Sequence, residues 1–223
     1  MHVLITDING NPNVGLYGFA NDHFCLLGEE VPEATAKQMG QVLGVPVHRI
    51  SLCGTSLIGV FCAGNNHGVV IPDIVFADER KHLEKLGIPF TVIKTRHTAL
   101  GNNLLCNDSG CLASNELSAD AKKSIRQALD VPLKPGNIAT LDIVGSCAAV
   151  NAGYCLVNKH ITPEEQAYIE ELLGVVCTTG TLNMGSPFIR SGIICNKNGF
   201  VTGNASGGPE ITNADQALGY LKI

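Results

Sequence analysis

Cysteine is the residue type in this 223-residue chain that could most directly carry out chemistry. A thiolate nucleophile needs only a nearby histidine and an orienting acid, and these can come from distant segments of a chain. The nine cysteines, however, are odd in number and include no Cys-x-x-Cys pair, which argues against a zinc ribbon and a complete disulfide framework. Cys106 and Cys195 each precede an asparagine in a repeated context, which favours small buried strand residues. We therefore predict no catalytic residue.

The spacing of histidines and glycines indicates neither a metal nor a cofactor. No two of the seven histidines are four residues apart and no His-Glu-x-x-His occurs, so we expect no metal site; His67 is interpreted as a hydrogen-bonding turn residue. Three glycine pairs have the spacing of the first half of a phosphate-binding loop: Gly10 and Gly15, Gly54 and Gly59, and Gly180 and Gly185. None is followed by the Lys and Ser/Thr that reach the phosphates and magnesium. Because the pairs recur in register, we interpret them as turns between repeated units and expect no cofactor.

The composition is that of a moderately acidic globular protein. With 45% hydrophobic and 16% charged residues, the chain can build a core. Its formal charge of −5 and its lack of tryptophan argue against naked nucleic acid as the main partner. The N-terminus lacks the pattern of a signal peptide, and Gly and Pro residues interrupt the charge-free stretch from Leu172 to Ile189. We expect no membrane span, reduced thiols and a cytoplasmic location.

The elements that would position these residues follow a repeat of about 45 residues. A glycine followed six residues later by an asparagine recurs at Gly15, Gly59, Gly101 and Gly145. The intervals between these glycines are 44, 42 and 44 residues, so that 223 residues accommodate five units. The fifth glycine is interpreted as Gly185, which would place five extra residues around Ser186 to Arg190.

Each unit is predicted to run strand, strand, helix, strand. The asparagines resemble hairpin turns between two short apolar strands. Thr162 begins a capping box with proline at the first helical position, and Ser118 caps the equivalent helix of the preceding unit. Sequences such as Leu43-Gly44-Val45-Pro46 recur at intervals of 43 or 44 residues and indicate a helix end followed by a strand.

The ends of the chain are predicted to meet. The fifth unit stops after its helix, without a third strand, whereas Met1 to Ile8 has the position of a third strand with no unit before it. If this segment completes the fifth unit, the five units form a closed ring with no open sheet edge. The fold class predicted is α/β, as one domain spanning residues 1–223.

Several motifs also resemble a known family, the translation initiation factor 6 family, in its archaeal length. The resemblance covers the whole chain and rests on the order and spacing of these segments: Asn65-Asn66-His67-Gly68, Ala99-Leu100-Gly101-Asn102, Cys106-Asn107-Asp108, Val144-Gly145-Ser146, Gly180 to Ser186 and Gly208-Pro209-Glu210. It implies the pentein fold, a fivefold pseudosymmetric α/β propeller, and a function that is not enzymatic.

The resemblance further implies a partner and a contact surface. Family members bind the large ribosomal subunit, chiefly the ribosomal protein uL14, and sterically block its association with the small subunit; in eukaryotes they also act in large-subunit maturation. The matching contact residues would be Gly15, Val60 and Asn102, and the symmetry of the repeat adds Ser146. For Gly15, a purely backbone requirement is an equally good interpretation. We expect a monomer.

A second function remains compatible with the same fold. Pentein enzymes that hydrolyse or transfer guanidine groups use a cysteine nucleophile, a histidine and carboxylates near the ring centre. Fold alone does not decide between these functions. Only Cys195 lies near the corresponding end of the chain, and its regular place in the repeat argues against a catalytic role.

Overall fold

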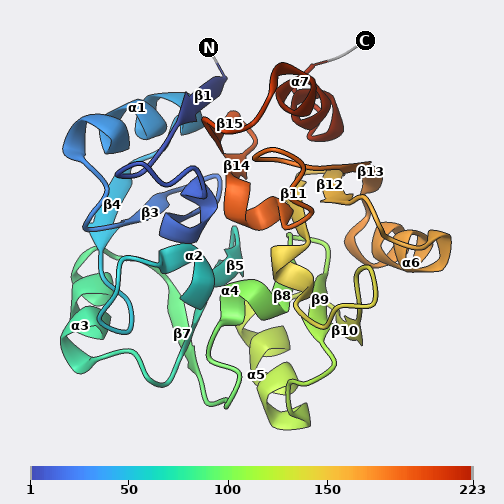
Figure 1. The fold of residues 1–223 in the computed structure, drawn as a ribbon. Helices are drawn as coiled ribbons and strands as arrows, with labels where there is room; N and C mark the ends of the chain where they lie inside the picture. Colours follow the sequence, from blue (N-terminus) through green and yellow to red (C-terminus); the bar gives the residue numbers. More distant parts are fainter. Residues whose placement is uncertain (1, 222–223) are drawn as a thin grey trace.

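A computed structural model describes residues 2–221 and shows five similar units arranged around a central axis (Figure 1). Each unit begins with a helix of one turn, which the sequence analysis did not predict, and continues with strand, strand, long helix and strand, as predicted. The first unit consists of η1 Val14–Tyr17, β2 Gly18–Ala20, β3 Cys25–Gly28, α1 Glu33–Leu43 and β4 Val47–Ile50, and the second of α2 Ile58–Phe61, β5 Ala63–Asn65, β6 Gly68–Pro72, α3 Ala77–Lys85 and β7 Phe90–Ile93. The third unit consists of α4 Leu100–Asn103, β8 Leu104–Cys106, β9 Cys111–Ser114, α5 Ala119–Leu129 and β10 Leu133–Gly136, and the fourth of η2 Val144–Ser146, β11 Ala148–Asn151, β12 Tyr154–Asn158, α6 Pro163–Leu173 and β13 Val176–Gly180. The fifth unit consists of η3 Ile189–Gly192, β14 Ile193–Asn196, β15 Gly199–Gly203 and α7 Gly208–Ala217.

Each unit forms one three-stranded sheet with the same topology. The first and second strands are an antiparallel hairpin, and the third strand returns through the helix to pair in parallel with the second. In the second unit, for example, Val69 of β6 is paired with Gly64 on one side and with Phe90 on the other. The first strands lie innermost, so that β2, β5, β8, β11 and β14 surround the axis while the long helices lie outside (Figure 1).

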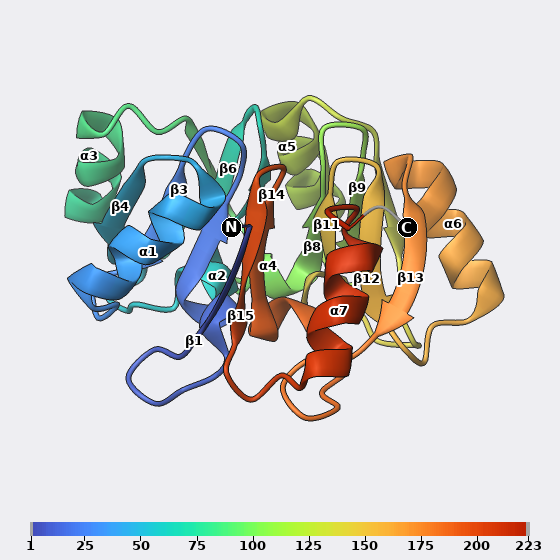
Figure 2. The ribbon, with the colours of Figure 1, turned by 90° about the horizontal axis from the view of Figure 1, so that it is seen from above.

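The predicted closure of the ring is confirmed. Strand β1, Val3–Thr6, pairs in parallel with β15 and supplies the third strand of the fifth sheet. Val3 is opposite Phe200 and Thr6 is opposite Gly203, and Figure 2 shows β1 beside β15. Residues from the two ends of the chain therefore share one sheet.

The two long helices with predicted capping residues, α5 and α6, begin directly after them. The hydroxyl of Thr162 accepts the N–H of Glu165 at 3.2 Å, and that of Ser118 accepts the N–H of Ala121 at 3.2 Å. Left-handed residues, such as Gly174 with φ of 63°, end the helices. Within residues 2–221, no helix has the length and apolar character that crossing a membrane requires.

The hydrophobic core is divided among the contacts between neighbouring units. Each of five clusters combines side chains from two adjacent sheets with one long helix packed over them. In one of them, Ile125 of α5 packs with Val70 and Ile93 of the second sheet and with Leu104 of its own sheet, and all four are buried. Burial of apolar surface therefore stabilises the ring mainly at the boundaries between units.

The position predicted for the fifth recurrent glycine is wrong. A Cβ atom on Gly59 would collide with the carbonyl oxygen of Gly15, one on Gly101 with that of Gly59, and the corresponding partner of Gly15 is the carbonyl of Arg190. Isolated β-bridges give the same register. The second residue of each bridge stands four residues before the recurrent position of its unit; these bridge residues are Asn11, Thr55, Leu141 and Ser186. The fifth equivalent is therefore Arg190 and not Gly185, and the bridge from Leu182 to Ser186 is only one residue longer than the others.

Candidate functional site

The five recurrent positions, here called the joint positions, lie in the one-turn helices at one end of the axis. They are Gly15, Gly59, Gly101, Gly145 and Arg190. At the four glycines the backbone of one unit approaches that of its neighbour so closely that a side chain would meet a carbonyl oxygen. This contact explains why glycine recurs with the period of the fold.

Three of the four predicted contact residues surround one cavity at this end. Gly15 of η1, Asn102 of α4 and Ser146 of η2 line a cavity of about 310 Å³, here called the joint cavity. Val60 does not line it, although its neighbour Gly59 on α2 does. Residues 131 positions apart in the sequence thus gather on one end of the ring, and their role in binding stays a prediction.

The side chains at this end are suited to contact with another macromolecule. Val60, Asn102 and Ser146 are half-buried. Two apolar residues that directly precede one-turn helices are more open, with Ile143 37% and Phe188 40% exposed. Gly15, by contrast, is buried, and its close approach to Arg190 favours the backbone requirement over a direct contact.

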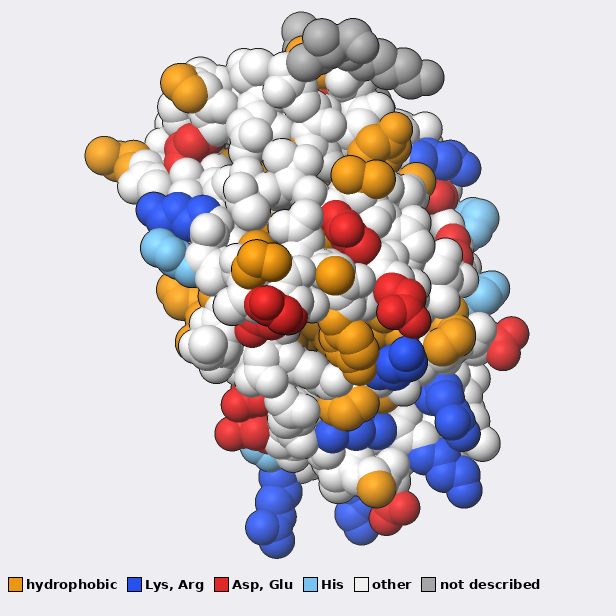
Figure 3. Space-filling model, turned by 90° about the vertical axis from the view of Figure 1, so that its right-hand side faces the viewer, with side chains coloured by type: hydrophobic (Ala, Val, Ile, Leu, Met, Phe, Trp, Pro, Cys, Tyr) orange, Lys and Arg blue, Asp and Glu red, His pale blue; other side chains and the backbone are white. Residues whose placement is uncertain are grey.

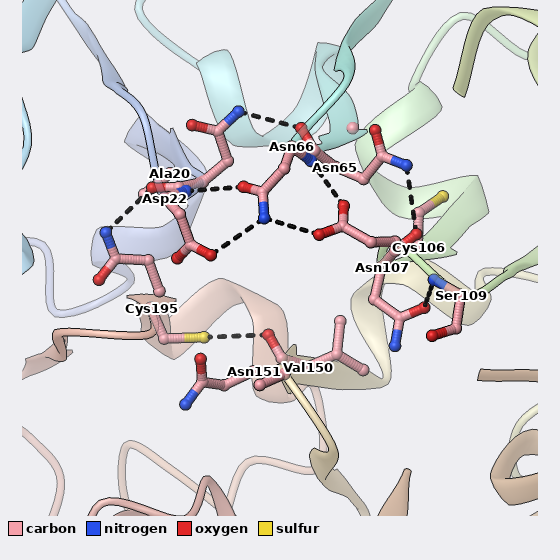
Figure 4. Close-up of a pocket in the computed structure, with 15 residues that line it drawn as sticks. Ala20, Asp22, Asn65, Asn66, Cys106, Asn107, Ser109, Val150, Asn151 and Cys195 are labelled. Atoms are coloured by element: carbon pink, nitrogen blue, oxygen red, sulfur yellow. Dashed lines mark hydrogen bonds between the residues drawn. The ribbon is translucent and has the colours of Figure 1, made fainter. Parts of the chain in front are cut away.

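The opposite end of the axis is lined by the turn asparagines of all five units (Figure 4). Each first strand leads from its one-turn helix to one of these turns, so the two ends are separated by the length of the inner strands. The cavity here has a volume of about 220 Å³. Asn66 bridges two acidic side chains at its edge, donating to Asp22 at 3.0 Å and to Asp108 at 2.7 Å.

The turn asparagines connect neighbouring units, a role that the sequence analysis did not assign to them. Asn65 donates from its amide to the carbonyl of Leu129 at the end of α5, at 2.9 Å, while its oxygen accepts the N–H of His67 in its own turn, at 3.0 Å. Three further turn asparagines donate to a carbonyl at the end of a neighbouring unit's helix or directly after it: Asn107 to Leu173, Asn151 to Leu218 and Asn196 to Leu43. The predicted hydrogen bonding of His67 is confirmed, since its Nδ1 lies 2.9 Å from the Leu129 carbonyl.

The cysteines near the axis are in surroundings that disfavour a thiolate. Burial raises the pKa of Cys195 to about 12, and its Sγ donates to the carbonyl of Val150 at 3.5 Å. Cys106 lies directly across the hairpin from Cys111, with the two sulfur atoms 2.7 Å apart. Among the described residues, no histidine lines the cavities that contain Cys195. This arrangement does not fit the cysteine nucleophile of the guanidine-modifying enzymes.

In each of the three phosphate-loop-like pairs one glycine lies in a turn, as predicted, and its N–H group donates to a carboxylate: Gly10 to Asp7, Gly54 to Glu79 and Gly185 to Glu210. Glu79 accepts hydrogen bonds from Cys53 and Gly54, each at 2.9 Å, and from Phe76 at the start of its own helix. Glu210 accepts from Gly185 at 2.8 Å in the same way. The N–H groups that would bind a phosphate in a true phosphate loop therefore hold a helix to the turn beside it.

Charge is unevenly distributed on the outer surface. On the face shown in Figure 3, Lys and Arg side chains gather toward the lower edge, where α5 lies in Figure 1, whereas acidic side chains are scattered over the whole face. The excess of five negative charges in the whole chain is therefore not spread uniformly. A surface of this kind can discriminate between partners by charge.

The molecule is thus defined as a ring-shaped α/β propeller whose candidate contact residues lie at one end of its axis. A family model described as "eIF-6 family" matches residues 3–217 of the chain. Proteins named translation initiation factor 6 are 32% identical over 222 residues in Staphylothermus marinus, covering 98% of each chain, and 34% identical over 227 residues in Pyrococcus abyssi, covering 99% of this chain and all of the relative. The relative of that name in Haloquadratum walsbyi is 35% identical over 215 residues, covering 96% of this chain and 95% of its own. The chain belongs to the eIF-6 family.

Proposed function

We propose that this protein is a translation initiation factor that binds the large ribosomal subunit and prevents its association with the small subunit. The observation that carries the proposal is the match of residues 3–217 to the eIF-6 family, together with relatives named translation initiation factor 6 along almost their whole length. A role in large-subunit biogenesis belongs to the same proposal. The protein would act in the cytoplasm, as a monomer and as one domain over residues 1–223.

The contact surface proposed is the end of the ring that carries the joint positions. Val60, Asn102 and Ser146 supply one apolar and two polar side chains there, and Gly15 supports the surface through its backbone. The main partner would be the ribosomal protein uL14. A net charge of −5 favours approach to a basic protein over indiscriminate binding to RNA, because complementary charge speeds association and suppresses wrong contacts.

Steric blocking requires a rigid body more than it requires chemistry. The closed ring, the cores between units and the hydrogen bonds of the turn asparagines all connect adjacent units, so that no unit can swing out by itself. A bound object of this size then occupies the space in which another subunit would dock. No covalent step is needed for this function.

The decisive experiment is a subunit-joining assay with purified archaeal ribosomal subunits. The protein should sediment with large subunits and lower the yield of joined ribosomes in proportion to the fraction of large subunits occupied. Unchanged joining at a saturating concentration of protein would refute the proposed function. Binding to large subunits without an effect on joining would support ribosome association and refute the anti-association role.

A further inference from the structure

Arg190 differs from the other joint residues because it carries a side chain. At the other four joints the absence of a side chain permits near contact between backbones. The joint between the fourth and fifth units is the one at which the joint residue carries a Cβ atom and a charged side chain. Ser146 and Arg190, which flank this joint, both line the joint cavity.

The guanidinium of Arg190 lies within the axial region of the ring. Arg190 lines both the joint cavity and a narrower cavity of about 60 Å³ between the inner strands. Its Cζ lies 5.9 Å from the centre of the Phe19 ring. Burial raises the pKa of Cys62 to about 12, and the nearby charge of Arg190 partly opposes that rise.

This positive charge has no protein partner within residues 2–221. Arg190 takes part in none of the ion pairs found there, and no described residue accepts a hydrogen bond from its side chain. It is also the only charged residue that lines either cavity in the described part of the chain. Since no fully buried side-chain nitrogen is left without a partner in the described residues, the unpaired N–H groups of Arg190 are not fully buried.

Two neutral donors lie around the same cavity. The amide of Asn102 comes from α4 and the hydroxyl of Ser146 from η2, and neither is used in a hydrogen bond within residues 2–221. Together with Arg190 on η3, they surround the cavity from three different units. A planar carboxylate offers two oxygens in one plane, whereas a tetrahedral anion can accept from several directions at once.

We propose that the joint cavity binds a small phosphate-type oxyanion, held by the guanidinium of Arg190 and by neutral donors from Asn102 and Ser146. A guanidinium presents five N–H donors in a planar fork that matches phosphate oxygens, and packing against an aromatic ring leaves the in-plane donors free. An unpaired charge in a partly enclosed cavity is costly, and a bound anion removes that cost. The proposal rests on the shared cavity and on the unpaired state of these side chains, and not on the proposed ribosomal function.

The test measures binding of inorganic phosphate to the full-length protein by isothermal titration calorimetry. The buffer contains neither phosphate nor a carboxylate, and ionic strength is held constant. We expect one saturable site per chain and a loss of affinity of about tenfold or more in Arg190→Gln, because a charge-assisted hydrogen bond is lost. Arg126→Gln, which removes the same charge from an exposed position on α5, should bind phosphate like the wild type.

The outcomes that would overturn the site are equally specific. Absence of saturable phosphate binding in the wild type, or equal affinity in Arg190→Gln, would exclude it. If Arg190→Gln does not fold, nuclear magnetic resonance of the wild type decides: phosphate should shift the amide signals of Asn102, Ser146 and Ser191 along one saturation curve. Shifts confined to residues away from the joint cavity would contradict the proposal.

Two further ligands identify the chemistry of the anion. Acetate tests a planar carboxylate, and tighter binding of acetate than of phosphate would overturn the phosphate-type assignment. Dimethyl phosphate tests a diester like that of a nucleic acid backbone. Tighter binding of the diester would support the site and indicate that its ligand is a phosphate of a nucleic acid backbone. Tighter binding of inorganic phosphate would indicate that its ligand is a free anion. A failure of subunit binding with intact phosphate binding would affect only the proposed function.

Discussion

At the scale of single residues, two adjacent asparagines on α4 have different surroundings. Asn102 is half-buried beside the joint cavity and its side chain makes no hydrogen bond within residues 2–221. Asn103 is buried, and its amide donates to the carbonyl of Ala99 at 2.8 Å. The same substitution at each position therefore separates a contact role from a structural one.

We expect Asn102→Ser to weaken binding to the large subunit with little change in folding stability. Asn103→Ser should instead lower the free energy of unfolding by about 1 kcal/mol, because it removes the hydrogen bond that the buried Asn103 amide donates to the Ala99 carbonyl, which keeps its backbone N–H partners. Subunit binding is measured by cosedimentation and stability by denaturant titration. Equal subunit affinity for Asn102→Ser and the wild type would remove Asn102 from the contact surface.

The thiol of Cys195 provides a prediction about reactivity. Raising its pKa from 9.0 to about 12 reduces the thiolate fraction near neutral pH by about three orders of magnitude. We expect iodoacetamide to modify Cys195 in the folded protein far more slowly than in the denatured chain, as followed by peptide mass spectrometry. Rapid, selective alkylation of Cys195 at neutral pH would instead support the guanidine-modifying alternative.

Residues in special backbone or contact environments were the easiest to predict from the sequence. The joint glycines and turn asparagines were found because a close approach between backbones or a tight turn restricts the residue type at a fixed spacing. Arg190 was missed because it breaks that restriction, and the nearby Gly185 replaced it in the repeat count. The bonds from the asparagines to neighbouring helices could not be predicted because they join residues that only the folded ring brings together.

At the scale of elements, the start of α6 is connected to the turn of the preceding unit by one carboxylate. Glu165 accepts the N–H groups of Ala139 at 2.9 Å, Thr140 at 3.0 Å and Thr162 at 3.0 Å. Burial alone would raise the pKa of Glu165, but these three hydrogen bonds outweigh it and the pKa is lowered. The charged form is therefore favoured by folding.

We expect Glu165→Gln to be less stable than the wild type near neutral pH by about 1 kcal/mol, a modest value because the carboxylate is partly exposed to solvent. A lowered pKa in the folded state stabilises above the unfolded pKa, and this contribution disappears as the pH falls through the folded value. The difference between the two proteins should therefore shrink below about pH 4.5. Urea titrations across this range measure it, with the exposed neighbour variant Glu164→Gln as a control that should match the wild type at each pH.

Long elements were predicted more successfully than short ones. The long helices were most evident where capping residues, apolar spacing and a left-handed terminal residue agree, as they do in α5 and α6. The one-turn helices contain only three or four residues, too few to show a period. The sequence also did not predict hydrogen bonds from distant turns to the carboxylates of Glu79, Glu165 and Glu210. A capping box predicts only the contact that each carboxylate makes at the start of its own helix.

At the scale of the whole molecule, closure of the ring makes the stability of all five units depend on one short strand. Strand β1 completes the fifth sheet, and Ile8 is fully buried in the core between the first and fifth units. Closure was predictable because counting repeats showed one third strand missing and one in excess. The axial cavities were not, since their shape depends on side chains from all five units.

We predict that deletion of residues 1–8 lowers the melting temperature of the entire molecule in a single cooperative transition. The reason is that an opened ring loses both the parallel pairing of β1 and the packing of Ile8. Calorimetry with circular dichroism would follow the change. A melting temperature equal to that of the wild type, or a separate transition in which only the fifth unit melts, would count against one closed domain.

The pairing of β1 with β15 also constrains the order of events during synthesis. Residues 3–6 are made 197 residues before their partners, residues 200–203 (200 − 3 = 197). Until those partners are made, β1 has no strand to join and Ile8 lacks the part of its core that the fifth unit supplies. Such a long sequence separation slows folding, and an unpaired strand is exposed to aggregation meanwhile. Nascent chains of this protein should therefore acquire their native resistance to proteases abruptly, only after residues 200–203 have left the ribosome.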